Sequence, residues 1–324
     1  MLIVMRAVVC EELGSVSVTE TKSPEPGPGH ILITVQAAGV NYVDGLFVQG
    51  RYQIKPPLPF VPGGEVAGVV TAAGPDVTEP AVGTRVIAMC GLGGFAEQVV
   101  VQADTAVPIP DRLDAARAAT FIQSFCTALF ALRNRGGLRA GEKVLVLGAG
   151  GGVGLAAVQV AKALGADVLA GASSAGKRQA AMAAGAAAVV DTSAEDVKTA
   201  ARAWSAGGVD LVYDPVGGDL ADPALRALRE GGRYLVIGFA SGTIPSLPLN
   251  QVLLRNRTVV GVDWGSWSLS NGPGQRALLV ELLDLVADGR LDPVAPRTAQ
   301  LDTAGEVLDD LLNRRVVGKV ALIP

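Results

Sequence analysis

The sequence has very little of the side chains that most often carry catalysis or hold metals. Among 324 residues there is one histidine, His30, and there are three cysteines, Cys10, Cys90 and Cys126, which lie far apart along the chain. Such a set can compose neither a disulfide framework nor a structural zinc cluster, and catalytic zinc is nearly excluded. Ser-His-Asp or Cys-His catalysis would need His30, which follows a Pro-Gly-Pro-Gly turn where a solvated residue is expected. The chemistry must therefore come from a cofactor.

An excess of charge and a membrane-spanning segment are also missing. The 27 Lys and Arg residues against 31 Asp and Glu residues give a formal net charge of −4, with no run of five like charges. We therefore expect no nucleic-acid partner. Residues 144–161 carry no charge, but their five glycines and their strand-then-helix pattern argue against a membrane span. The sequence begins with a short apolar strand without a basic leader or a small-residue cleavage site, so we expect a cytoplasmic protein.

Glycine is abundant, and its most informative cluster lies within residues 141–162. There an apolar, β-branched run leads into a glycine-rich turn that opens an amphipathic helix, with the spacing Ala149-x-Gly151-x-x-Gly154. Small residues let backbone N–H groups approach a pyrophosphate, and the helix dipole favours the anion. The turn predicts a dinucleotide site, although alanine replaces the first glycine of the usual fingerprint. A structural glycine turn or the cofactor loop of a methyltransferase would give a similar local pattern.

The pattern that follows the glycine turn favours the dinucleotide interpretation. Strands and helices alternate, which is typical of a doubly wound parallel sheet. The predicted strands cover residues 167–173, 187–191, 209–214, 233–238 and 258–262, and the predicted helices cover 153–164, 176–184, 194–204 and 219–230. Taken as a whole, this pattern predicts an α/β Rossmann domain.

The end of the second predicted strand indicates which dinucleotide is bound. An acid is expected there if the ribose hydroxyls of NAD are to be held. Ser173 and Ser174 stand in its place, followed by Lys177 and Arg178, which offer hydroxyl groups and positive charge to a 2′-phosphate. We therefore expect NADPH as the cofactor. The alternative is that Lys177 and Arg178 are ordinary solvated residues of a helix's first turn.

The first 120 residues have a different texture. Short candidate strands are separated by proline and glycine turns, which is typical of a compact β-barrel-like domain. These strands cover residues 4–10, 31–38, 66–72, 85–89 and 96–101, and helical periodicity begins only near Asp114. Later in the chain we expect helices at 275–288 and 303–314 and a last strand at 318–323. That last strand must pair with a sheet, and the N-terminal domain is the available candidate.

Several motifs together resemble a zinc-independent quinone oxidoreductase of the medium-chain dehydrogenase/reductase superfamily. They are Gly39-Val40-Asn41-Tyr42-x-Asp44, Pro62-Gly63-Gly64-Glu65-Val66-Ala67-Gly68, Gly94-Phe95-Ala96-Glu97, residues 141–162, Val212-Tyr213-Asp214-x-Val216-Gly217, residues 238–242, Pro248-Leu249-Asn250 and Gly318-Lys319. The resemblance covers essentially the whole chain. It implies a GroES-like β-rich catalytic domain at 1–122 and 267–324, and a Rossmann NADPH-binding domain at 123–266. Zinc-dependent members place a cysteine near Val43 and a histidine where this chain has Gly64.

The resemblance also implies roles for individual residues. The cofactor would contact Thr127, Gly151, Gly152, Val153, Gly154, Ser173, Ser174, Lys177, Arg178, Gly238, Phe239 and Arg314. Arg314 is also explained as an exposed arginine at a helix end. The family often has a tyrosine after the third strand of the Rossmann sheet, and Thr192 stands there in this chain.

The implied reaction is hydride transfer from C4 of NADPH to a quinone or to the β-carbon of a conjugated carbonyl. Asn41 and Tyr52 are the candidate catalytic residues, because each offers a hydrogen bond to a developing oxyanion. A turn-capping amide and a half-buried loop aromatic are the respective alternatives. Asp44 is expected to support its loop, and Trp264 and Trp267 either wall the substrate pocket or pack in the core.

Two other functions are compatible with the sequence. An enoyl thioester reductase, acting on enoyl-CoA or an acyl carrier, is a close alternative because the superfamily contains both activities. A non-enzymatic structural or regulatory protein that binds NADPH is the alternative from another class. The resemblance also implies an oligomer. We expect a homodimer that pairs the short apolar strand at 258–262, because the edge of this strand would otherwise be left open.

Overall fold

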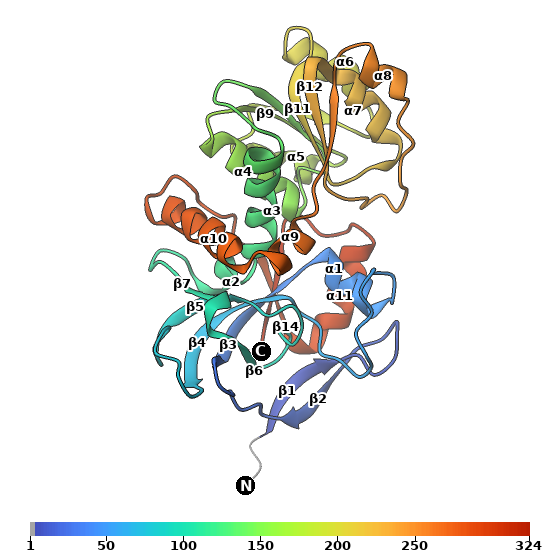
Figure 1. The fold of residues 1–324 in the computed structure, drawn as a ribbon. Helices are drawn as coiled ribbons and strands as arrows, with labels where there is room; N and C mark the ends of the chain where they lie inside the picture. Colours follow the sequence, from blue (N-terminus) through green and yellow to red (C-terminus); the bar gives the residue numbers. More distant parts are fainter. Residues whose placement is uncertain (1–3) are drawn as a thin grey trace. The chain divides into compact units, whose positions relative to one another are not determined.

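The computed structural model describes residues 4–324, which form two compact units (Figure 1). The terminal unit contains both ends of the chain and comprises residues up to 123, 279–288 and 295–324. The central unit comprises residues 124–278 and 289–294. Residues 267–278 and 289–294, which the family resemblance assigned to the GroES-like domain, are grouped here with the central unit.

The central unit contains one sheet of six parallel strands in the order β10–β9–β8–β11–β12–β13. The strands are β8 (Lys143–Val146), β9 (Asp167–Ala172), β10 (Ala188–Asp191), β11 (Val209–Asp214), β12 (Leu228–Val236) and β13 (Thr258–Gly261). Numbered along the unit, this order is 3-2-1-4-5-6, which is the strand order of the Rossmann fold. The prediction of a doubly wound parallel sheet is confirmed.

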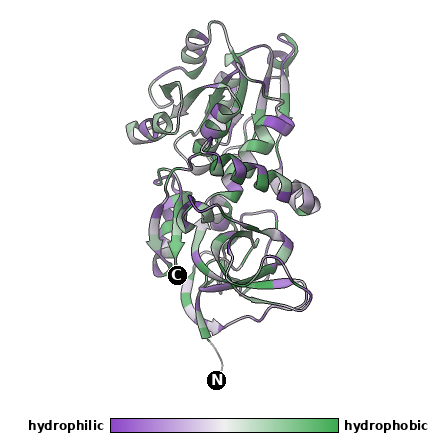
Figure 2. Cartoon of the chain, turned by 90° about the vertical axis from the view of Figure 1, so that its left-hand side faces the viewer, coloured by the Kyte–Doolittle hydropathy of each residue, from purple (hydrophilic) through white to green (hydrophobic). Residues whose placement is uncertain are grey.

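Helices cover both faces of this sheet. The helices α4 (Gly152–Ala163) and α5 (Ala175–Ala183) contact each other and the strands β8, β9 and β10. The helices α6 (Val197–Trp204) and α7 (Ala221–Ala227) contact each other. They lie in crossover connections that run along the sheet in the direction opposite to those of α4 and α5. Because such crossovers are right-handed, the two pairs lie on opposite faces. Green, hydrophobic colouring follows the strands between them, in line with a sheet that is buried on both sides (Figure 2).

One boundary in the central unit differs from the prediction. The predicted helix at 219–230 ends at Ala227, and β12 begins at Leu228, five residues before the predicted start. Leu228 pairs with Val209 of the neighbouring strand across a register shift. This pairing is a tertiary interaction that overrides the local helical pattern, so the sequence periodicity did not reveal it.

The terminal unit is built around a mixed sheet in the order β14–β15–β3–β4–β5–β7, with β6 also paired to β3. Its strands are β3 (His30–Val40), β4 (Glu65–Ala73), β5 (Arg85–Met89), β6 (Gln98–Gln102), β7 (Ala106–Pro108), β14 (Arg297–Gln300) and β15 (Val320–Ile323), and β1 (Val4–Val9) and β2 (Ser17–Lys22) form a separate ribbon. The prediction that the last strand joins the N-terminal sheet is confirmed, since β15 pairs antiparallel with β3.

The remaining helices are short, apart from one that the sequence predicted. They are α1 (Tyr42–Val48), α2 (Ala115–Ala119), α3 (Thr127–Leu129), α8 (Leu249–Leu253), α9 (Trp264–Ser270), α10 (Gly272–Ala287) and α11 (Ala304–Leu312), with π-helical turns at Ile122–Cys126 and Phe130–Arg135. The strands β2, β7 and β14 and the helices α1, α8 and α9 were not predicted. Each is short, and the alternation or periodicity that a sequence can show is correspondingly weak.

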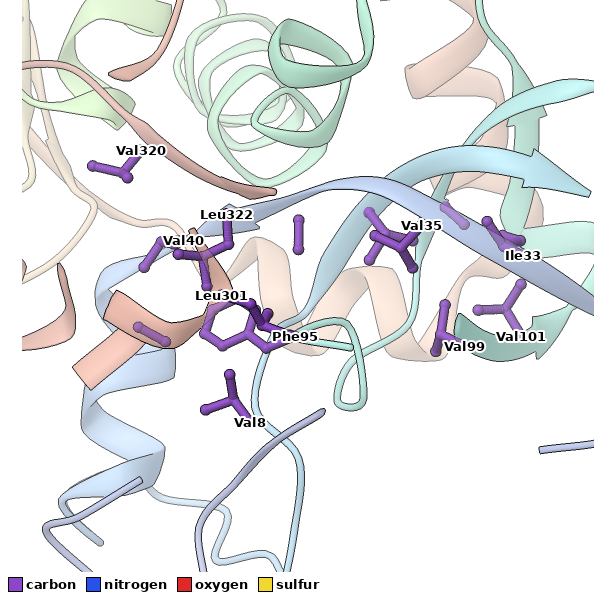
Figure 3. Packing of buried hydrophobic residues seen from close by; sticks show 14 of the residues in the cluster. Val8, Ile33, Val35, Val40, Phe95, Val99, Val101, Leu301, Val320 and Leu322 are labelled. Atoms are coloured by element: carbon purple, nitrogen blue, oxygen red, sulfur yellow. The ribbon is translucent and has the colours of Figure 1, made fainter. Parts of the chain in front are cut away.

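The core of the terminal unit joins residues from both ends of the chain. Figure 3 shows Phe95 beside Val8 from β1, Val40 from β3, and Leu301 and Leu322 from the C-terminal segment. All five side chains are buried. The C-terminal segment therefore contributes to the core of the unit that begins at the N-terminus.

Candidate functional site

The glycine turn between β8 and α4 has the geometry of an anion cradle. Gly151 is the N-cap of α4, and no side chain caps this helix end. A Cβ atom on Gly154 would lie 2.2 Å from the carbonyl oxygen of Gly148, so only glycine lets α4 pack this closely against the turn. The first N–H groups of a helix lack intrahelical partners and favour an anion. The residues present thus fit a dinucleotide pyrophosphate.

The predicted 2′-phosphate cluster lies directly beside this turn. A Cβ atom on Gly150 would lie 2.3 Å from the Cβ atom of Lys177, which shows how closely the start of α5 approaches. The Ser174 hydroxyl caps α5 by accepting a hydrogen bond from the Lys177 N–H at 3.4 Å. Ser173 and Ser174 are both exposed. The structure therefore brings together two groups of residues that the sequence predicted separately.

Arg178 is held differently from its neighbour Lys177. Its guanidinium forms an ion pair with Asp191 at 2.7 Å and donates to the carbonyl of Ala172 at 3.3 Å. Hydrogen bonds from the Ser193 hydroxyl and N–H, together with the Arg178 charge, hold the pKa of Asp191 below its ordinary value. An acid thus lies at the end of β10, although the end of β9 has none, and Arg178 compensates its charge.

A third loop at the same edge of the sheet is anchored by Asp214. This buried carboxylate ends β11 and accepts hydrogen bonds from the N–H groups of Val216 at 2.7 Å and Gly217 at 2.9 Å, and from the Tyr234 hydroxyl. Burial raises the pKa of Tyr234, which keeps its hydroxyl a donor. Gly217 has a φ of +65°, and a Cβ atom there would lie 2.9 Å from the Phe239 ring.

These contacts place Gly238 and Phe239 beside the loop that follows β11. The strand order of the sheet reverses between β8 and β11, and ligands bind at the carboxyl ends of the strands at such a point. The sequence marked Asp214 only as part of a motif, so its function as a loop anchor was missed. An acid that ends a strand just before a Pro-Val-Gly-Gly turn is the signal that was available.

Thr127 and Arg314, the other two predicted cofactor contacts, lie in different units. Thr127 begins α3, which contacts α4 within the central unit. Arg314 is exposed, follows α11 in the terminal unit and has a φ of +60°. The contribution of Arg314 to cofactor binding stays a prediction.

The terminal unit contains a cluster of polar side chains, which we call the Asn41 network: the buried Asn41, Asp44 and Glu65 and the partly buried Lys319. Asn41 is 4% exposed, and Asp44 and Glu65 are each 1% exposed. The Asn41 side-chain nitrogen donates to Glu65 Oε1 at 2.8 Å, and the Asn41 side-chain oxygen accepts from the Lys319 ammonium. Lys319 Nζ also lies 3.3 Å from Glu65 Oε1.

Asp44 supports the start of α1, as expected. Its Oδ2 accepts from the backbone N–H of Asn41, the N-cap residue, at 2.7 Å. Burial raises the pKa of Asp44 to about 7, and the Glu65 charge acts in the same direction. The N–H of Asn41 and the Lys319 charge oppose that rise. Two buried carboxylates therefore lie near one cation, and Asp44 takes up a proton near neutral pH.

The aromatic candidates make local contacts. Tyr52 is partly buried in the loop after α1, with its ring 4.9 Å from that of Phe47 in an edge-on arrangement. Trp264 donates its indole N–H to Gln275 at 2.8 Å, and Trp267 stacks on Phe130 with the ring centres 4.6 Å apart. The core-packing alternative accounts for these tryptophan contacts. A contribution of either tryptophan to a substrate pocket stays a prediction.

Comparison with known proteins points to the same superfamily as the sequence motifs do. Two family profiles match: "Alcohol dehydrogenase GroES-like domain" at residues 27–111 and "Zinc-binding dehydrogenase" at residues 152–283. The chain is 38% identical to the bovine (Bos taurus) "Quinone oxidoreductase-like protein 2" over 320 residues, which cover 98% of this chain and 92% of the relative.

Solved structures agree with these matches. The quinone oxidoreductase of Pseudomonas syringae aligns with a TM-score of 0.90 at 30% identity, covering 99% of this chain and 100% of that one. The quinone oxidoreductase of Thermus thermophilus, which was also solved in complex with NADPH, aligns with a TM-score of 0.84 at 36% identity and the same coverage. The chain belongs to the quinone oxidoreductase-like family of the medium-chain dehydrogenase/reductase superfamily.

The predicted fold class is confirmed by this membership. The quinone oxidoreductase-like chain has a GroES-like domain and a Rossmann-type sheet of six parallel strands. No helix within residues 4–324 has both the length and the apolar character that crossing a membrane requires.

The residues present do not fit a zinc ion, although one matching profile is described as zinc-binding. Within the described part of the chain, no group of three or more His, Cys, Asp and Glu side chains is arranged to hold a metal. Gly64 offers no side-chain ligand. Burial raises the pKa of Cys90, so its sulfur stays a thiol, and that thiol donates to the carbonyl of Gly63. The side chains at these positions of the quinone oxidoreductase-like protein therefore offer no zinc ligand set.

Glu65 and Lys319 are the two members of the Asn41 network that the sequence did not mark as site residues. They are 254 positions apart and meet because β15 pairs with β3, with Val320 opposite Val40. The Gly-Lys pair that precedes a final apolar strand was visible in the sequence. Its partner was not, since nothing local connects it with residue 65.

Proposed function

We propose that this protein is an NADPH-dependent oxidoreductase that transfers a hydride to a quinone or an α,β-unsaturated carbonyl without using zinc. The observation that carries the proposal is the uncapped start of α4 with Lys177 packed beside the glycine turn. A pyrophosphate fits the first site, and a 2′-phosphate fits a cation and hydroxyl groups at the second. The NADPH complex of the Thermus thermophilus relative supports the choice of cofactor.

Each group of residues has a defined task in this proposal. The turn at residues 151–154 holds the pyrophosphate, and Ser173, Ser174 and Lys177 hold the 2′-phosphate. Bound NADPH supplies the hydride. The protein then needs only to orient the acceptor and to stabilise the oxygen on which negative charge develops. We assign that hydrogen bond to Asn41, with Tyr52 as the second candidate donor.

The proposal is tested by following NADPH oxidation with three acceptors: a naphthoquinone, an alkyl enone and a crotonyl thioester. Turnover with the quinone or the enone is the expected result. Turnover with the thioester alone would instead establish an enoyl thioester reductase. NADPH binding without turnover of any acceptor would contradict an enzymatic function and favour a structural or regulatory one.

We also propose that two copies pair through the edge strand β13. Among the described strands, β13 pairs only with β12, which leaves one edge of a parallel sheet open. Leu249 and Leu253 of the neighbouring helix α8 are 79% and 76% exposed, respectively. Sedimentation velocity should show a dimer that Val259→Lys dissociates, and a monomeric wild-type protein at micromolar concentration would contradict this assembly.

We propose in addition that the protein is located in the cytoplasm, which cell fractionation tests.

A further inference from the structure

The orientation of the Asn41 carboxamide is set by two charges, one buried on Glu65 and one partly buried on Lys319. Its oxygen accepts from the Lys319 ammonium, and its nitrogen donates to the Glu65 carboxylate. A half-turn of the amide would place N–H groups against the ammonium and a carbonyl oxygen against the carboxylate. Both contacts would be repulsive, and a group that is 4% exposed has little water to screen them. Only one orientation is therefore stable.

The two charged groups are themselves fixed by the backbone. Glu65 uses its second oxygen, Oε2, to accept the N–H of Gln123 at 3.0 Å. A Cβ atom on Gly39 would lie 2.8 Å from Glu65 Oε1, so glycine at position 39 makes room for this carboxylate. Lys319 directly precedes β15, whose first residue, Val320, lies opposite Val40. The register of β15 on β3 thus places the ammonium beside the amide.

We propose that Glu65 and Lys319 are positioning residues that lock Asn41 so that its remaining amide N–H is presented to the acceptor oxygen. One of the two amide hydrogens donates to Glu65, and among the described residues the other has no acceptor. The ammonium on the amide oxygen polarises the amide and strengthens that second donor, as expected in a chain of hydrogen bonds. This inference rests on the proposed oxidoreductase function.

A double-mutant cycle between Lys319 and Asn41 tests this proposal. Lys319→Met should lower kcat on the order of 10-fold or more while the KM for NADPH changes little, because a transition-state donor is weakened. Lys319→Arg, which keeps a cation, should recover much of that loss. In an Asn41→Ala background, Lys319→Met should cause no further loss, because the lysine acts through the amide. Losses that multiply in the double variant would overturn the proposal.

Two controls separate this result from a general loss of structure. Lys198→Met removes an exposed lysine of α6 and should leave kcat unchanged. If Lys319→Met does not fold because Glu65 is left buried without its cation, Lys319→Met combined with Glu65→Gln takes its place in the cycle. That pair replaces both charged groups with neutral ones.

A readout that needs no turnover distinguishes failure of this inference from failure of the proposed function. With asparagine labelled selectively with ¹⁵N, the Asn41 side-chain N–H₂ should exchange slowly with solvent in the wild type and much faster in Lys319→Met. Equal exchange in the two proteins would refute the locking of Asn41, whatever the activity. A wild type that oxidises NADPH with no acceptor, yet shows the exchange difference, would refute the oxidoreductase function and leave the positioning intact.

Discussion

The two units present polar groups to a ligand in opposite ways. In the central unit the groups are backbone N–H donors, which are accessible because Gly151 and Gly154 carry no side chain. In the terminal unit they are the side chains of the Asn41 network, which are buried or partly buried and compensate one another. The first arrangement depends on the small volume of the glycines, and the second depends on the balance of charge among the side chains. Substitutions that add volume should therefore damage the central unit most, and substitutions that change charge should damage the terminal unit most.

The largest effect is expected from Gly154→Ala. Its Cβ atom would lie 2.2 Å from the Gly148 carbonyl oxygen, so α4 must move away from the turn. Such overpacking costs about 1–3 kcal/mol of stability, and we expect NADPH affinity to fall roughly 100-fold as the N–H donors are displaced. Calorimetric titration and thermal unfolding measure both effects.

Gly151→Ala sharpens this test. Its Cβ atom would lie 3.5 Å from the same oxygen, which is an ordinary contact, so the unfolding temperature should not fall. NADPH binding should still weaken, because the N–H donors are accessible only while residue 151 carries no side chain. Gly27→Ala, at an exposed glycine in the terminal unit where nothing lies within 4 Å, is the matched control and should change neither quantity. Full NADPH affinity in Gly154→Ala would show that the turn does not hold the pyrophosphate.

A smaller effect is expected from the cations beside the turn. Lys177→Ala should weaken NADPH binding about 10- to 100-fold, the usual cost of losing a hydrogen bond to a charged group, and should leave NADH binding nearly unchanged. Arg178→Ala should have less effect on NADPH, because its guanidinium is already paired with Asp191. Equal losses for NADPH and NADH in Lys177→Ala would contradict the 2′-phosphate assignment.

The smallest effect concerns the charge of Asp44. Its pKa is raised from an ordinary value of 3.8 to about 7, so the folded protein keeps a proton that the unfolded chain releases. The proton on Asp44 therefore contributes fully to the stability of the folded protein below pH 3.8, and this contribution is lost as the pH rises through about 7. Between about pH 6 and about pH 8 this loss amounts to about 1 kcal/mol.

Asp44→Asn isolates this contribution, because the amide keeps an oxygen for the Asn41 N–H and cannot ionise. Thermal unfolding on either side of neutral pH should show a smaller decrease for the variant than for the wild type. The charged groups that surround Asp44, Lys319 and Glu65, are the same in both proteins, so the difference reports on Asp44. An identical decrease in the two proteins would mean that Asp44 stays ionised in the folded state.

The same contrast explains how much the sequence could predict. Elements whose signal is local were predicted well: the strands β5 and β11 have the predicted bounds, and the glycine turn lies where its spacing indicated. Where tertiary pairing decides the structure, prediction failed, as at the start of β12. The network could not be predicted as a unit, because Lys319 and Asn41 are 278 positions apart and only the pairing of β15 joins them. Asn41 and Asp44 were singled out, but not the charges that orient the amide.

The placement of β15 has a consequence for the order in which the protein is made. The sheet of the central unit draws all its strands from one continuous stretch, so it can form while translation is still under way. The terminal unit cannot be finished at that stage, since Lys319 and its strand emerge from the ribosome some 278 residues after Asn41. Until then the Glu65 carboxylate has no cation beside it. In the nascent chain this carboxylate must therefore stay in contact with water.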